Sequence, residues 1–330
     1  MVEAFLIGLV GAIAGRLSVL WAACLAEPGR AAGITRCTSC QKDRPWQGLL
    51  IRIPSRCNSC GTKSASWTWL VSLLLGIIFC FYAWILVDAG CQKIAEVRPD
   101  APLFSSRLPF HLLFIFLLMT AVLTDLIDYV IPDQITWAGA ALAVGFAALS
   151  GELQMIHIWV DWNDELVTLY GPFLPHWIKD HQHLHGLAWS LCGGAMGASL
   201  MWMARIAAHR ILGFPAIGFG DVTLMAMIGS FMGWQPVLCV LAVAPLIGMI
   251  LGLSAFVLTG RSFVAFGPYL CAAAFVVLCT WREIWEVQGL RIIFGHWPTL
   301  AALLAGSLTL YCLLLWGVRI LRETPIRQLR

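Results

Sequence analysis

The sequence predicts an all-α protein that crosses a membrane many times and carries one small polar segment outside it. Hydrophobic residues make up 60% of the 330-residue chain, charged residues make up 12%, and the mean hydropathy is +0.82. Soluble domains are about one-half apolar and one-quarter charged. The lipid bilayer is therefore the first partner that we expect. The formal net charge of +3 is too small to indicate a polyanion, so no nucleic-acid partner is expected.

Nine apolar runs predict about nine transmembrane helices. Most of them approach the roughly 20 residues that an α-helix needs to cross the hydrocarbon core. The runs are residues 4–24, 67–87, 109–124, 134–149, 187–204, 222–234, 236–258, 264–279 and 297–316. The first run follows Glu3 rather than a basic segment, which favours a retained helix over a cleaved signal peptide. Arg16 lies inside this run and either reaches an interface or faces the protein interior.

The runs divide the chain into four parts. We expect a first transmembrane helix (1–26), a polar segment (27–66), a membrane core (67–281) and an additional helix with a basic tail (282–330). The core includes a polar insertion at residues 152–186. Its histidines His181, His183 and His185 could bind a metal ion, but no carboxylate or cysteine is spaced to complete such a site. We therefore predict a solvated loop there.

The polar segment carries two Cys-x-x-Cys pairs, Cys37 with Cys40 and Cys57 with Cys60, separated by sixteen residues. This spacing is typical of a zinc ribbon, in which four thiolates close a tetrahedral site. A segment so short builds little core, so a structural zinc ion would supply most of its folding free energy. Two disulfides or a redox pair are the alternative, and both need an oxidising compartment. The other eight cysteines lie mostly in apolar runs and are expected to be small buried hydrophobes.

The distribution of basic residues predicts the orientation of the chain. With nine spans and the amino terminus outside, the side that holds the cysteine segment and the C-terminal tail carries fourteen Lys and Arg. The opposite side, which holds the 152–186 insertion, carries six. Cytoplasmic loops carry the basic excess, so the cysteine segment and the tail are expected to face the cytoplasm. The same count places Asp125 and Asp221 together at the cytoplasmic ends of their spans.

Asp221 closes the sequence Gly218-Phe219-Gly220-Asp221, directly before an apolar run. The glycines Gly218 and Gly220 permit a sharp turn and a close approach of the backbone. The Asp221 carboxylate either caps the helix that follows or acts on a substrate or ion, as ionisable groups at membrane depth usually do.

Asp125 supplies a second acid, about one turn inside the end of its predicted helix, where capping does not explain it. Asp128 lies on the same helical face and is its natural rival. Pro132 and Asp133 follow, and they predict a turn and an N-cap for the next span.

Two carboxylates that share a small site cannot both ionise easily, so one of them stays protonated. The ionised partner can take a proton from water while the protonated partner polarises a peptide carbonyl. This chemistry is aspartyl proteolysis, and it needs no nucleophilic Ser or Cys. The chain shows no convincing GxSxG, HExxH or P-loop motif.

At these residues the sequence resembles the type IV prepilin peptidases, or prepilin leader peptidases, a GxGD family of aspartic proteases. The resemblance rests on Asp125 with Ile131-Pro132-Asp133, on Gly218-Phe219-Gly220-Asp221-Val222, on the two cysteine pairs and on Phe266-Gly267-Pro268-Tyr269-Leu270. It implies a multi-pass protein of the bacterial cytoplasmic (inner) membrane. Such an enzyme cuts the basic leader from type IV prepilins or type II secretion pseudopilins at the cytoplasmic membrane face. Asp125 and Asp221 would be its catalytic pair.

Many members of this family also methylate the new amino terminus with S-adenosylmethionine. Two stretches linked with methyl transfer depart from the family pattern, at residues 15–18 and 66–71, so this activity stays open. Thr223 stands where a Lys is usual, which bears on substrate contacts rather than on the acids. Other GxGD intramembrane proteases, a carboxylate-dependent ion or proton transporter and a catalytically silent assembly protein remain as alternatives.

Overall fold

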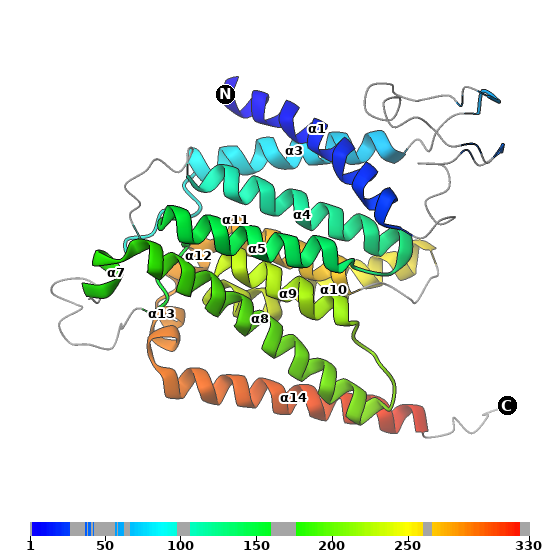
Figure 1. Ribbon diagram of the computed structural model, residues 1–330. Coiled ribbons are helices and arrows are strands. Elements are labelled where there is room, and N and C mark those ends of the chain that lie inside the picture. Colours follow the sequence, from blue (N-terminus) through cyan, green and yellow to red (C-terminus); the bar gives the residue numbers. More distant parts are fainter. Residues whose placement is uncertain are drawn as a thin grey trace.

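The computed structural model describes residues 2–26, 37, 39–40, 42, 57, 59–62, 67–97, 106–159, 176–259 and 266–323. Within these ranges the chain forms helices and loops and contains no β-strand, so the predicted all-α class is confirmed for them (Figure 1). The helices are α1 (Val2–Leu25), α3 (Trp67–Val87), α4 (Arg107–Asp128), α5 (Asp133–Ser150), α7 (His176–Asp180), α8 (Gln182–Leu212), α9 (Phe219–Met232), α10 (Trp234–Thr259), α11 (Gly267–Cys279), α12 (Trp281–Glu286), α13 (Gln288–Gly295) and α14 (Trp297–Glu323).

Six of the helices in the described ranges are long and apolar enough to cross a membrane, namely α1, α3, α4, α8, α10 and α14. The chain is therefore treated as a multi-pass membrane protein. The predicted number of about nine spans is not confirmed. α9 and α11 are apolar but have only 14 and 13 residues, and α5 is not among the six candidates. α9 and α11 are mostly buried in the bundle, whereas α5 keeps an exposed face that includes Trp137 and Leu149. Figure 1 shows the arrangement of the helices.

α1 packs along α3 through a row of small residues. A methyl group added at Gly11 would lie 2.7 Å from Cβ of Phe79, and one added at Gly15 would lie 2.7 Å from Cα of Ser72. Small residues let two membrane helices approach until their backbones nearly touch. Arg16 follows this row and is buried, with 9% exposure. Of the two positions expected for it, an interface or the protein interior, the interior is therefore the correct one.

α8 and α9 make the closest helix contact in the core. A methyl group added at Gly193 or Gly197 of α8 would collide with backbone carbonyl oxygens of Gly229 or Met225 in α9. The converse collision, of a group added at Gly229 with the Gly193 carbonyl, is equally close. α9 is almost wholly buried, because α5, α10 and α11 also pack against it.

The bundle has two chemically different ends. At the first, which we call the aspartate end, α1 ends, α3 begins and α4 ends, since Ala26, Trp67 and Ile127 pack on one small hydrophobic cluster. The Asp125 and Asp221 side chains lie at this end. At the opposite end, which we call the capped end, short helices and loops cover the bundle (Figure 1).

The capped end is held by hydrogen bonds from buried side chains to loop carbonyls. Arg107 is fully buried and donates from Nη2 to the Gln154 carbonyl at 2.7 Å. Trp234 donates from Nε1 to the Ile158 carbonyl at 2.7 Å, and His157 bonds the Glu96 carbonyl at 3.0 Å. Burial lowers the pKa of His157 to about 4, so its imidazole is neutral near pH 7.

In the histidine cluster predicted as a solvated loop, His183 and His185 are instead helical, and His181 is the N-cap residue of α8. α8 begins at Gln182, five residues before the predicted start of this span. His185 is fully buried and its Nε2 accepts the Ile158 N–H at 3.2 Å, whereas His183 is exposed. For His185 the prediction was wrong because the beginning of the insertion, residues 152–159, packs against this side chain, whereas His181 is exposed as well as His183. Residues 160–175 of the insertion lie outside the described ranges.

Some of the cysteines in the apolar helices are buried and others are exposed. Cys271 and Cys279 are buried as expected, but Cys192 is exposed on α8. A thiol tolerates a lipid-facing position because it is small and weakly polar.

Replacing Gly193 with alanine is expected to destabilise the protein by about 1 to 3 kcal/mol, because the added methyl group meets a backbone oxygen that cannot move aside cheaply. The measurement is the unfolding temperature in detergent. Gly306→Ala is the matched control, because a methyl group there meets nothing within 4 Å. Equal unfolding temperatures for the two variants would contradict the tight α8–α9 contact.

Candidate functional site

Asp125 is placed by the last turn of α4. Tyr129 ends this helix in the left-handed conformation, with φ of 56°, and its N–H donates to the Asp125 carbonyl at 3.0 Å. Tyr129 is the only non-glycine residue with positive φ in the described ranges. Asp125 itself is buried, with 6% exposure, and its carboxylate accepts a hydrogen bond from the backbone N–H of Gly267. The chain reversal after α4 therefore leaves this acid facing the start of α11.

Asp221 lies in the first turn of α9. Its Oδ2 accepts the N–H of Gly218, the N-cap residue, at 3.2 Å. The capping role considered for Asp221 is thus present, and the side chain is also buried, with 8% exposure. An acid in this position is favoured by the positive end of the helix dipole.

The two carboxylates share one region. They are close enough for the charge of Asp125 to act on Asp221, and the charges of both act on the Cys271 thiol of α11. Asp128, the rival considered for Asp125, is the last residue of α4 and is also buried. Of these two acids of α4, Asp125 is the one whose charge acts on Asp221.

Ile131 and two glycines bring the three chain segments together. A methyl group added at Gly220 would lie 3.0 Å from Cβ of Ile131. One added at Gly267 would lie 2.8 Å from Cδ1 of Ile131 and 2.7 Å from Oδ2 of Asp125. Gly220 is therefore needed for close approach, as expected. Gly218 has an ordinary backbone conformation and room for a side chain, and what it contributes is its N–H.

Pro132 and Asp133 form the expected turn with a shift of one position. Pro132, not Asp133, is the N-cap of α5, and no side chain caps this helix. Asp133 is the first helical residue, where its charge still favours the N-terminal end of the dipole. The predicted cap was wrong because a proline just before the helix can itself occupy the extended N-cap conformation.

Two further side chains near Asp221 were not predicted as part of the site. Arg205 of α8 lies over the ring of Phe219 at 5.5 Å, and its charge acts on Asp221. Trp202 packs edge-on against the same ring at 6.0 Å. The basic stretch at the end of α8 was the available clue to Arg205, but the sequence alone does not show that α8 ends beside α9.

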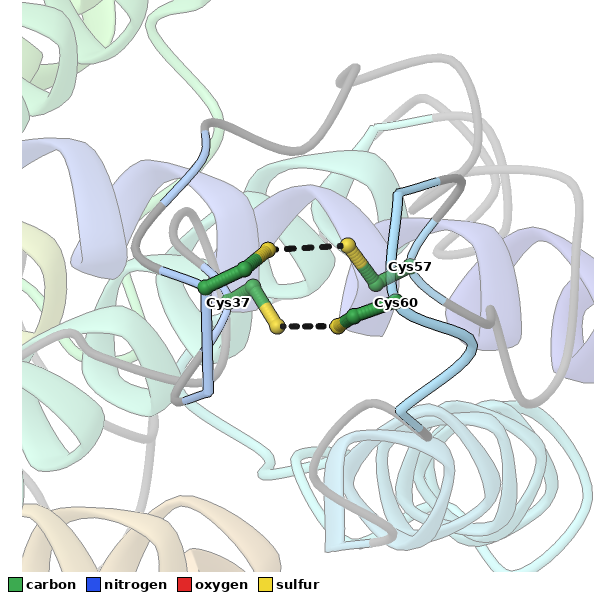
Figure 2. A group of neighbouring side chains, drawn as sticks. Cys37, Cys57 and Cys60 are labelled. Carbon is green, nitrogen blue, oxygen red and sulfur yellow. Dashed lines mark hydrogen bonds between the residues drawn. The ribbon is translucent and has the colours of Figure 1, made fainter.

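The four cysteines of the polar segment form one cluster (Figure 2). Their sulfur atoms all lie within 4.8 Å of one another, and the thiols are free rather than bridged. The Cys37 and Cys60 sulfurs are 3.4 Å apart, and the Cys40 and Cys57 sulfurs are 3.5 Å apart. A tetrahedral zinc ion with bonds of about 2.3 Å separates its sulfur ligands by roughly 3.8 Å, so the donor set fits a metal of this size.

The two halves of the cluster have the same backbone turn. The Cys37 N–H donates to the Lys42 carbonyl, and the Cys57 N–H donates to the Thr62 carbonyl, five residues on in both cases. Backbone hydrogen bonds from Cys40 and Ser39 lower the pKa of the Cys37 thiol to about 5. Such amides stabilise thiolates, which are the form that binds a metal. The rest of the predicted 27–66 segment lies outside the described residues.

Residues 112–253 match the model of the Type IV leader peptidase family. The predicted resemblance is confirmed. The matching segment holds Asp125 and Asp221 but ends within α10, so it includes neither the cysteine cluster nor α11 nor α14.

Several relatives carry the name prepilin leader peptidase/N-methyltransferase. The protein from Aeromonas salmonicida strain A449 is 26% identical over 170 residues, which cover 51% of this chain and 47% of the relative. The protein from Neisseria gonorrhoeae is 24% identical over 255 residues, 76% of this chain and 72% of the relative. The match thus spans about half the length of the Aeromonas salmonicida protein. No solved structure gives a significant match.

The purified protein is expected to carry about one metal ion per chain, because four thiols at this spacing complete a single tetrahedral site. Cys37→Ser is expected to lose that metal. Cys192→Ser, an exposed cysteine of α8, is the control and should keep it. Elemental analysis of the purified protein makes the comparison, and metal-free wild-type protein would rule the site out.

Proposed function

We propose that this chain is a membrane aspartic endopeptidase that removes the leader from type IV prepilins or type II secretion pseudopilins. The observation that carries the proposal is the placement of two buried aspartates, Asp125 and Asp221, on different helices in one region of the bundle. The match of residues 112–253 to the leader peptidase family and the names of the relatives support the same activity.

The chemistry follows from a pair of carboxylates that share one proton. Water adds to the scissile peptide carbon while it gives a proton to the ionised carboxylate, and the protonated carboxyl gives its proton to the carbonyl oxygen. Collapse of the tetrahedral intermediate breaks the C–N bond. The carboxyl group that took a proton from water gives it to the leaving nitrogen, while a hydroxyl group of the intermediate returns a proton to the other carboxylate, so the pair regains its starting state.

We assign the ionised role to Asp221 and the protonated role to Asp125. Asp221 lies at the positive end of α9, accepts the Gly218 N–H and is acted on by the charge of Arg205. Asp125 lies in the last turn of α4, where the helix dipole disfavours a negative charge. The Gly267 N–H orients its carboxyl group.

We also propose that α5, α9 and α11 cross the membrane, which gives nine spans. The first turn of α9 holds Asp221 in the aspartate end, and the residue after its end, Gly233, packs on the capped end through Trp189. α11 begins beside Asp125, while Arg282, three residues after its end, donates its N–H to the Cys91 carbonyl of the capped end. The basic excess of the loops supports a cytoplasmic aspartate end in a bacterial inner membrane.

Zinc is the metal that we propose for the cysteine cluster of Cys37, Cys40, Cys57 and Cys60. Four thiolates in a closed tetrahedral set are typical of structural zinc. Bound there, the ion would hold the two backbone turns together and take no part in peptide cleavage. N-methyltransferase is part of the relatives' names. Methylation of the new amino terminus, with S-adenosylmethionine as donor, is proposed as a separate step that the mass measurement below tests.

Asp125→Asn and Asp221→Asn are each expected to reduce leader cleavage at least about a thousandfold, because each removes one of two cooperating groups. Asp128→Asn, a buried acid of the same helix, is the matched control and should retain substantial activity. Co-expression with a prepilin that has a basic leader, followed by intact-mass analysis of the pilin, is the measurement.

A leader-sized mass loss made by wild type and Asp128→Asn alone supports the proposal, and a further methyl-sized increment adds methyl transfer. Unchanged cleavage by Asp125→Asn or by Asp221→Asn contradicts the proposed catalytic pair. Carboxylate-dependent proton flux in liposomes without any cleavage would favour a transporter instead.

Gly267→Ala is expected to lower kcat by roughly 10- to 100-fold and to change KM much less. The added methyl group would displace the Asp125 carboxyl group from its position, and small displacements of a reacting group are costly. Gly306→Ala is the control, since that position is open. A change in KM with an unchanged kcat would show that Gly267 does not position Asp125.

A further inference from the structure

An apolar groove of about 460 Å³ runs between α8, α10 and α14. Three helices and two loop positions contribute, and all of the lining residues lie within the described ranges. The lining includes Ile217, Leu241, Pro245, Phe266, Leu308 and Tyr311. Ser307 and Tyr311 already donate their hydroxyl groups to carbonyls of Leu304 and Ala204. The side chains therefore offer a hydrocarbon surface.

Two lining residues of the groove are chain neighbours of the glycines that bond the two aspartates. Ile217 immediately precedes Gly218, whose N–H donates to Asp221. Phe266 immediately precedes Gly267, whose N–H donates to Asp125. A second groove, of about 400 Å³ between α4 and α5, has no lining residue next to either segment. The position of the first groove thus connects it to the proposed site of cleavage.

The groove wall also offers one polar acceptor. Pro245 lies inside α10 and has no N–H, so the carbonyl of Leu241, four residues earlier, lacks its usual helical donor. Both residues line the groove. A carbonyl in an apolar setting is stabilised by a donor, and a peptide N–H can supply one whereas a lipid acyl chain cannot.

We propose that this groove binds the apolar stretch of the substrate polypeptide that adjoins the scissile peptide, with the Leu241 carbonyl accepting one of its N–H groups. The inference rests on the proposed function and deepens it. The basic leader is excluded from the groove, because a charged side chain in such a lining would be costly to desolvate. The apolar stretch is therefore on the other side of the cut.

α14 forms one wall of this groove although it lies outside the family-matching segment. It is held against α8 by the Tyr311 hydroxyl at 3.4 Å from the Ala204 carbonyl and by Arg319 Nη1 at 3.2 Å from the Ile211 carbonyl. This wall would contribute to the selection of substrate by the shape and length of its apolar stretch.

The first experiment uses two leucines of the same helix. Leu308 lines the groove and Leu310 does not, and both are partly exposed, at 37% and 57%. Two probes are compared: a full-length prepilin with its apolar stretch, and a short peptide that spans the same scissile bond without it. Leu308→Trp is expected to lower the ratio of kcat/KM for the long probe over the short probe about tenfold, and Leu310→Trp to leave this ratio unchanged. Equal ratios in the two variants would overturn the groove.

A second experiment keeps the groove testable if cleavage fails. A photoreactive benzoyl-phenylalanine is placed at position 308 or at position 310 in an Asp221→Asn background, and the full-length prepilin is added in detergent and in vesicles. Cross-linking to the prepilin from position 308 alone supports the proposal. Cross-links to lipid only, or to the prepilin equally from both positions, overturn it. Wild-type protein that cuts neither probe, while position 308 still cross-links, would refute the peptidase and leave the groove standing.

Discussion

The contact between α8 and α9 is the constraint on which the rest of the structure depends. Within a bilayer, helices gain little from hiding apolar surface from one another, since lipid is equally apolar, and close packing must supply the association. The glycines at 193, 197 and 229 allow two backbones to touch there. Because α9 is enclosed and carries Asp221 in its first turn, this contact also fixes where that carboxylate lies relative to α4 and α11.

Much of this architecture could be predicted from the sequence. Apolar runs located each of the long helices, but the end of α8 lies eight residues beyond the predicted one. The basic excess placed Asp125 and Asp221 at one end without any knowledge of the fold. The approach of Gly267 to Asp125 could not be predicted, because it depends on which helices become neighbours and not on any local pattern. The spacing of Gly193 and Gly197 in α8 is typical of a close helix contact, although it does not show which helix is the partner.

At the capped end, the polar residues at the beginning of the insertion led to a wrong prediction of solvent exposure. The stretch at residues 151–159 contains Gln154 and His157 and was expected to be part of a solvated insertion, yet both side chains are buried. Glu96 is also buried, and its carboxylate lies 3.6 Å from Arg291. Polar residues are buried where other parts of the chain supply partners, and those partners come from segments distant in sequence. A single sequence does not reveal such pairings.

The shortness of α9 has a consequence for the depth of Asp221. Fourteen residues rise only about 21 Å, whereas the hydrocarbon core of a bilayer is roughly 30 Å thick. α9 is almost wholly buried among α5, α8, α10 and α11, so protein rather than lipid surrounds it. The depth of the Asp221 carboxylate is therefore set by packing within the bundle and not by the thickness of the bilayer.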